Sequence, residues 1–167
     1  MIDIRRLSPS TDVATYHQVW RWMQAQPELY EHLHGFGDFS AFIRPNFPVL
    51  DFALKVDGKL IAFAAWIYRG EKRCQFCLVT PPNVKPKVLL AALYNLQALY
   101  FLQLSFDELY IHLRPLPQYN KARRLAKRMG WTRVNDDLWT MTLTQYLDSH
   151  FSPTLCPEAI LIPPRGQ

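Results

Sequence analysis

One pair of cysteines, Cys74 and Cys77, has the C-x-x-C spacing found in metal-binding and redox motifs. A structural zinc site of this kind needs a second pair of ligands, and the sequence has only one more cysteine, Cys156. The pair lies in a stretch typical of a β-strand, where residues three apart point to opposite faces. We therefore expect two packed thiols and no metal site.

Carboxylates and imidazoles gather in a second segment, where Glu28, Glu31, His32 and His34 lie within seven residues of one another. A carboxylate or imidazole within reach of an amine can act as a general base. Glu31 and His32 are the candidates in this segment, and Glu71, at the start of a predicted strand, is a third. The alternative interpretation is a polar loop that only contacts water.

The sequence Asp148-Ser149-His150 contains the three residue types of a hydrolase triad. A working triad needs three groups that converge from a rigid scaffold. Adjacent residues in a predicted tail do not converge, so we interpret this match as coincidental.

Positive charge is concentrated in the second half of a chain whose formal net charge is +5. Eleven Lys or Arg residues lie between Lys72 and Arg133, against only Asp107 and Glu108. Such a region attracts a phosphorylated cofactor, a nucleic acid or an acidic protein surface, or it faces only water. No nucleic-acid-binding motif is present. The densest part is a basic helix face made of Lys121, Arg123, Arg124, Lys127 and Arg128.

The composition of the 167 residues, with 49% hydrophobic and 14% aromatic residues, is that of one globular domain. Residues 88–104 carry no charge, but tyrosine, asparagine and glutamine interrupt them, so we expect a buried helix and no membrane segment. Residues 1–4 are typical of a strand and not of a signal peptide. We therefore expect a cytoplasmic protein, or one that joins a particle assembled in the cytoplasm.

Hydrophobic periodicity and turn signals predict an alternation of strands and helices. The expected strands are residues 2–7, 49–56, 59–68, 72–79, 106–113, 131–134 and 138–143. The expected helices are residues 11–26, a short one from Asp38 or Ser40 to residue 43, a long one from Pro86, and residues 119–129. The order implies a mixed α/β fold with helices on the faces of the sheet. Residues 144–167 are rich in proline, and we expect an extended, non-helical tail that follows a domain of residues 1–143.

The run from Ala122 to Trp131 resembles the late helix of the GNAT acetyltransferase superfamily, because Ala122, Leu125, Gly130 and Trp131 fall in its register. The resemblance covers about residues 1–143. It implies a mostly antiparallel sheet of six to seven strands and the use of acetyl-CoA. Where the family carries a tyrosine proposed as general acid, this chain has Ala126.

The family's glycine-rich coenzyme loop corresponds to residues 82–88, which contain no glycine and two prolines. If those residues adopted the left-handed conformations that glycine allows, each would cost about 1–2 kcal/mol. Lys85 and Lys87 could bind phosphate through side-chain charge instead. By resemblance, backbone amides near the end of the preceding strand polarise the thioester. The coenzyme-binding residues implied are Leu78, Val79, Thr80, Asn83, Val84, Lys85, Lys87, Asn120 and Arg124.

Two functions remain open from the sequence. The glycine-free loop favours a non-catalytic GNAT-like binding or assembly protein, similar to small phage morphogenesis proteins, that needs no cofactor. The 144–167 tail would then bind a protein partner or a second copy, and the basic helix face an acidic partner. The alternative is an acyl-CoA-dependent N-acetyltransferase that acts on a small amine or a protein amine.

Overall fold

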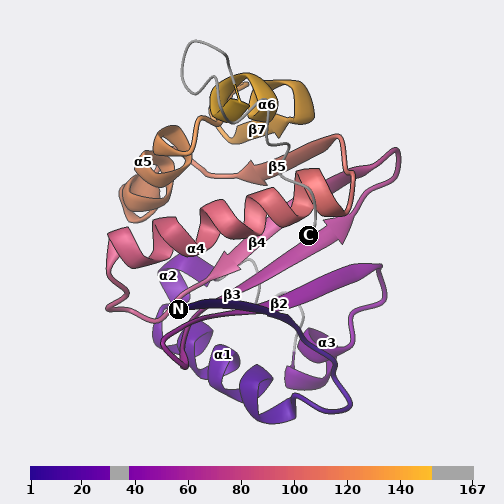
Figure 1. Ribbon diagram of the computed structural model, residues 1–167. Helices are drawn as coiled ribbons and strands as arrows, with labels where there is room; N and C mark the ends of the chain where they lie inside the picture. Colours follow the sequence, from indigo (N-terminus) through magenta and orange to yellow (C-terminus); the bar gives the residue numbers. More distant parts are fainter. Residues whose placement is uncertain (31–37, 152–167) are drawn as a thin grey trace. The chain divides into compact units, whose positions relative to one another are not determined.

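The computed structural model describes residues 1–30 and 38–151 (Figure 1). Seven strands form one mixed sheet in the order β1-β2-β3-β4-β5-β7-β6. The strands are β1 (Ile2–Arg6), β2 (Val49–Val56), β3 (Lys59–Tyr68), β4 (Arg73–Val79), β5 (Glu108–His112), β6 (Thr132–Arg133) and β7 (Leu138–Thr142). The α-helices are α1 (Val13–Ala25), α2 (Pro27–Tyr30), α3 (Phe39–Ile43), α4 (Pro86–Ala98), α5 (Asn120–Arg128) and α6 (Leu143–Phe151). These bounds confirm the mixed α/β class and the expected order of the strands along the chain.

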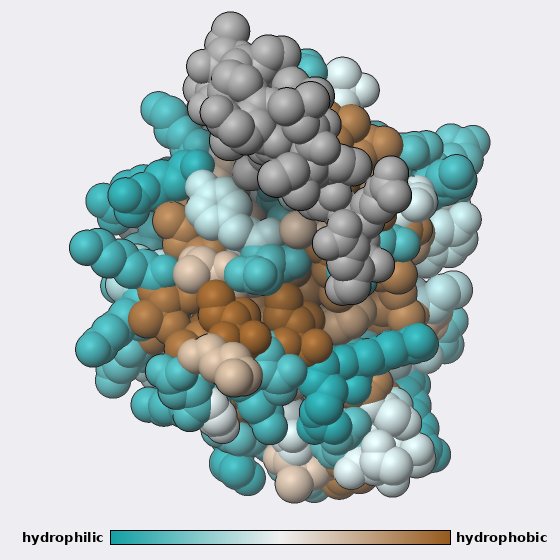
Figure 2. All heavy atoms as spheres, viewed as in Figure 1, coloured by the Kyte–Doolittle hydropathy of each residue, from teal (hydrophilic) through white to brown (hydrophobic). Residues whose placement is uncertain are grey.

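The chain divides into two compact units, and each is described by itself. Unit 1 contains Met1–Tyr68 and Phe76–Leu93, and unit 2 contains Arg69–Gln75 and Tyr94–Gln167. Figure 2 shows that both apolar and hydrophilic atoms reach the surface in this view.

Unit 1 is built on the antiparallel strands β1, β2 and β3. Asp57 and Gly58 join β2 to β3 with positive φ angles of 49° and 79°, which is the backbone of a tight two-residue hairpin turn. An Asp-Gly pair between two strands favours this kind of turn. Helices α1 and α3 pack on one face of these strands, through Tyr16 and Met23 of α1 and Phe42 of α3.

Helix α1 begins two residues later and ends one residue earlier than predicted. Val13, its first residue, is 40% exposed, whereas Val19 is fully buried. Asp12 occupies the N-cap position, but its carboxylate accepts from the Ser8 amide at 2.8 Å and pairs with Arg5 at 2.9 Å. The hydrogen bond from Ser8 is the main cause of a lowered pKa at Asp12. Its side chain thus holds the strand-to-helix turn and does not cap the helix.

Unit 2 contains β5, with β7 antiparallel to it and the short β6 at the edge. A segment of β4 pairs in parallel with β5, from Arg73 to Gln75. A 3₁₀ turn, η3 (Pro117–Tyr119), leads into α5, and Gly130 follows α5 with a φ of 85°. A left-handed glycine at this place ends a helix without steric cost, as the sequence predicted. A π-helical turn, η2 (Leu99–Gln103), follows α4.

The segment after β7 is a correction to the sequence analysis, because residues 143–151 form helix α6 and not an extended tail. The Thr142 amide donates to Gln145 Oε1 at 3.0 Å, and the Gln145 amide donates to Thr142 Oγ1 at 3.1 Å. This reciprocal pair is a capping box, which stabilises a helix start. Tyr146 is buried and stacks on Phe101 with 5.0 Å between ring centroids. Residues 152–167, with Cys156, lie outside the described residues.

We expect Thr142→Ala to lower the free energy of unfolding by about 1 kcal/mol, because the first turn of α6 loses its side-chain acceptor. Thr144→Ala is the matched control, since Thr144 is exposed on the same helix. Urea unfolding of both variants measures the difference. Equal midpoints for the two would show that the capping box contributes nothing to stability.

The described residues contain no cluster of His, Cys, Asp and Glu that could hold a metal ion. Cys74 is buried and Cys77 half-buried, and both are free thiols. Burial raises the pKa of the Cys74 thiol, which keeps it protonated and unreactive. None of the described helices combines the length and the apolarity that crossing a bilayer requires.

Candidate active site

The end of β4 is held by two side chains from the α1–α2 region of unit 1. The Thr80 amide donates to the Tyr30 hydroxyl at 3.0 Å, and the Thr80 carbonyl accepts from Gln26 Nε2 at 2.8 Å. Gln26 also donates to the Trp22 carbonyl at 3.2 Å, which fixes the amide against the end of α1. Both backbone polar groups of Thr80 therefore have hydrogen-bond partners, and the partner of its amide is the phenol oxygen of Tyr30.

The start of α4 has backbone amides that lack an acceptor within the helix. Leu89 is the first residue of this helix whose amide reaches an earlier carbonyl, that of Lys85 at 3.1 Å. Helix geometry leaves the amides of Lys85, Lys87 and Val88 without intrahelical acceptors, and Pro86 has no amide to leave unpaired. Lys85 and Lys87 are exposed at the same helix end. Free amides, the helix dipole and two ammonium groups together favour an anion here.

The strain expected of a glycine-free loop is absent. The described non-glycine residues with positive φ are Asp57, Glu71, Lys72 and Ser105, and none of them lies between β4 and α4. The loop connects the strand to the helix without left-handed residues, so the cost of 1–2 kcal/mol per residue does not arise. Pro86 occupies the first helical position, where its missing amide costs no intrahelical hydrogen bond.

Comparison with solved structures identifies the fold. The N-acetyltransferase PseH of Campylobacter jejuni, in complex with acetyl coenzyme A, matches with a TM-score of 0.62 and 16% identity, over 85% of this chain and 99% of that one. The spermidine/spermine N-acetyltransferase SpeG of Vibrio cholerae matches with a TM-score of 0.63 and 16% identity, over 90% of this chain and 99% of that one. The chain has the GNAT fold. No protein-family model and no curated protein matches the sequence.

The coenzyme-binding residues predicted for this GNAT fold are divided between the two units. Unit 1 brings together the end of β4 and the start of α4, with Leu78, Val79, Thr80, Asn83, Val84, Lys85 and Lys87. Asn120 and Arg124 belong to α5 in unit 2, where the Asn120 side chain accepts from Arg123 Nη2 at 2.6 Å. Ala126, at the family's tyrosine position, is buried. The polar groups of Thr80, Lys85 and Lys87 therefore all belong to unit 1.

The general bases predicted from the sequence remain predictions. Glu31 and His32 lie outside the described range. Glu71 is exposed in the turn after β3, with a φ of 53°. The predicted partner surfaces also remain predictions. On the basic helix face of α5, four of the five cations are exposed and Arg123 is half-buried.

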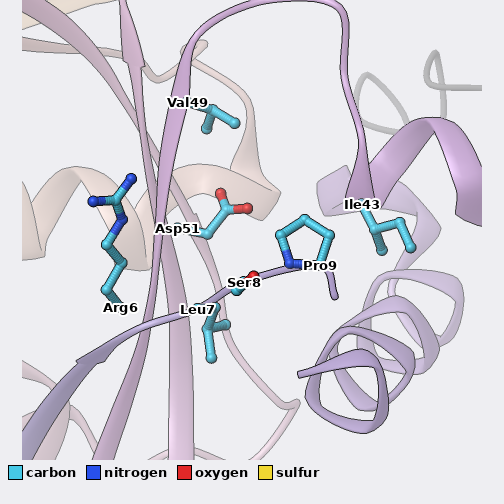
Figure 3. Close-up of a pocket in the computed structure, with 7 residues that line it drawn as sticks. All are labelled: Arg6, Leu7, Ser8, Pro9, Ile43, Val49 and Asp51. Atoms are coloured by element: carbon cyan, nitrogen blue, oxygen red, sulfur yellow. The ribbon is translucent and has the colours of Figure 1, made fainter. Parts of the chain in front are cut away.

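A second polar group in unit 1 lies on β2, where Asp51 is only 8% exposed (Figure 3). Tyr16 of α1 donates to Asp51 Oδ2 at 2.6 Å. Burial raises the pKa of Asp51 to about 6, against opposing effects of the Tyr16 hydrogen bond and the charge of Arg6. The carboxylate faces a cavity of about 410 Å³, which is lined by Arg6, Leu7, Ser8, Pro9, Ile43, Val49 and Asp51.

A narrower cavity of about 30 Å³, room for about one water molecule, shares Val49 and Asp51 with the first. Its walls are almost entirely apolar and extend to Cys77 and Val79 of β4. Asp51 thus lines both the open cavity and the narrow apolar one, whose walls include residues of β4.

Sequence reasoning missed Gln26, Tyr30, Tyr16 and Asp51. The contacts of Gln26 and Tyr30 with Thr80 join residues 54 and 50 positions apart, and no local pattern marks them. Asp51 did carry a signal, because it alternates with Val49 and Ala53 on the inward face of β2. A carboxylate at such a position is unusual unless it is paired.

Proposed function

We propose that the chain is an acyl-CoA-dependent N-acyltransferase whose coenzyme diphosphate binds at the start of α4. The observation that carries the proposal is the set of free amides at Lys85, Lys87 and Val88 beside two exposed ammonium groups. These donors fit a diphosphate, which needs several hydrogen bonds and positive charge. The GNAT fold, with an acetyl-CoA complex among its structural neighbours, supports the same conclusion.

Bound acetyl-CoA would supply an activated thioester, and the residues of this chain would hold and polarise it. We infer that the Tyr30 hydroxyl, and not the Thr80 amide, polarises the thioester carbonyl. A phenol hydroxyl can accept one hydrogen bond and donate another. The Thr80 amide orients this oxygen, so Tyr30 can stabilise negative charge that develops on a nearby carbonyl oxygen. The acceptor in this proposal is an amine.

The non-catalytic assembly function finds less support. The structural neighbours named above are N-acetyltransferases, and they offer nothing in favour of a pseudoenzyme, an assembly role or a phage origin. The argument from the loop is also weaker than the sequence suggested, because the start of α4 retains its anion-binding donors.

The test is calorimetric titration of acetyl-CoA, combined with measurement of thiol release in the presence of a panel of amines. We expect the double variant Lys85→Ala/Lys87→Ala to bind acetyl-CoA about 10- to 100-fold more weakly, because each exposed ammonium group contributes about 0.5–1.5 kcal/mol through its hydrogen bond to phosphate and the free amides remain. Lys59→Ala is the control, since Lys59 is an exposed lysine at the β2–β3 turn of the same unit.

The proposal requires binding of acetyl-CoA tighter than about 100 μM, which corresponds to about 5–6 kcal/mol. It also requires release of thiol with at least one amine. Acetyl-CoA binding without any turnover would instead support a GNAT-fold binding protein, and the absence of binding would overturn the site itself.

A further inference from the structure

Asp51 is a buried carboxylate without an ion-pair partner among the described residues. Tyr16 holds Oδ2 at 2.6 Å, and the Asp51 backbone carbonyl accepts from the Leu7 amide, but within residues 1–30 and 38–151 no group forms a hydrogen bond with Oδ1. Arg6 is the cation that acts on this carboxylate, and it is exposed at the edge of the cavity (Figure 3). An exposed cation contributes little to a buried charge, because water screens it. The carboxylate therefore lacks the compensation that buried charges normally have.

The surroundings of Asp51 define what could supply that compensation. Leu7, Pro9, Ile43 and Val49 give the 410 Å³ cavity an aliphatic wall, and Ser8 adds a hydroxyl. The volume lies within the usual range for small-molecule sites. A ligand that matches these groups carries one positive charge and an aliphatic body. Arg6 at the edge disfavours a second positive charge nearby.

We propose that this cavity binds an aliphatic primary amine, with its ammonium group on Oδ1 of Asp51. Tyr16 fixes the carboxylate so that Oδ1 stays available, and the aliphatic body packs against Ile43 and Val49. The site does not coincide with the end of β4. Asp51 is on β2, two strands from β4, and neighbouring strands lie about 4.8 Å apart, so the separation is about 10 Å. Asp51 is therefore a ligand-recognition residue and not the base beside Thr80.

The experiment titrates the full chain with 3-methylbutylamine at pH 7.5, without acetyl-CoA, and uses 3-methyl-1-butanol as the uncharged analogue. We expect saturation at millimolar concentration for the amine and binding at least about tenfold weaker for the alcohol, because only the amine forms a charge-assisted hydrogen bond. Asp51→Asn should weaken amine binding at least about tenfold, whereas Asp3→Asn, an exposed carboxylate on β1 outside the cavity, should leave it unchanged.

The pH dependence gives a second readout. The charged or titratable groups that act on Asp51 are Tyr16 and Arg6. Burial raises the pKa of the Tyr16 phenol far above its usual value, so this phenol stays neutral between pH 5 and 8. Amine affinity should be constant above about pH 7 and fall below about pH 6, as Asp51 takes up a proton. Equal binding of amine and alcohol, wild-type affinity in Asp51→Asn, or no saturation below about 10 mM would each overturn the proposal. Acyl transfer does not enter the experiment, so an inactive coenzyme site would leave the result intact.

Discussion

Asp51→Asn is expected to raise the free energy of unfolding at pH 7 by about 3 kcal/mol. The pKa of Asp51 is about 6 in the folded chain, against 3.8 for an unperturbed carboxyl group, because burial penalises the charged form. At about 1.4 kcal/mol for each pH unit, the difference corresponds to about 3 kcal/mol. Asparagine has a similar shape and can still accept from Tyr16, but it never ionises.

The sign of this change in stability follows from whether folded or unfolded chains hold the Asp51 proton more tightly. Between pH 3.8 and about 6, the folded chain retains a proton that the unfolded chain has lost, so stability falls as the pH rises through this window. The advantage of Asp51→Asn should be absent near pH 3.5 and complete above pH 6. Urea unfolding of both proteins from pH 3.5 to 7.5 measures it. A constant difference across this range would mean that Asp51 is not a destabilising buried charge.

This expected cost bears on function. A residue that lowers stability and could be replaced by an isosteric neutral one is typical of a functional position. The stability experiment and the amine titration therefore test one feature from two sides. Asp51→Asn should produce a more stable chain that has lost its ligand.

Tyr30→Phe is expected to lower kcat of the proposed transferase about 100-fold. Removal of one donor from an oxyanion site costs about 10²–10³ in rate, because the negative charge develops only in the transition state. The KM for acetyl-CoA should change little, since Lys85 and Lys87 bind the phosphates. Steady-state kinetics with a fixed amine at several acetyl-CoA concentrations separate the two parameters.

Tyr68→Phe is the control for this variant, because Tyr68 is 44% exposed at the end of β3 in the same unit. Thermal unfolding should show a loss of only about 1–3 kcal/mol for Tyr30→Phe, from the Thr80 amide that loses its acceptor. An unchanged or higher kcat would show that the hydroxyl covers the Thr80 amide and does not assist the reaction. In that case the amide itself would be the donor.

The sequence by itself determined most of the elements and the fold. The Asp57-Gly58 turn and the glycine after α5 are local signals, because turn and helix-end residues depend on neighbours in the chain. The same reasoning failed at α6. The prolines after residue 152 favour an extended chain, but the capping box at Thr142 and Gln145 starts a helix before them.

Only the tertiary structure decided the site. Tyr30 reaches Thr80 across 50 positions, and Tyr16 reaches Asp51 across 35, so no window of the sequence contains both partners of either contact. The loop before α4 shows the same limit. Its missing glycines suggested a lost coenzyme site, but the number of free amides depends on where the helix begins, and Pro86 begins it at no cost in donors. Local patterns determine elements, whereas the chemistry depends on which groups folding brings within hydrogen-bond distance and removes from water.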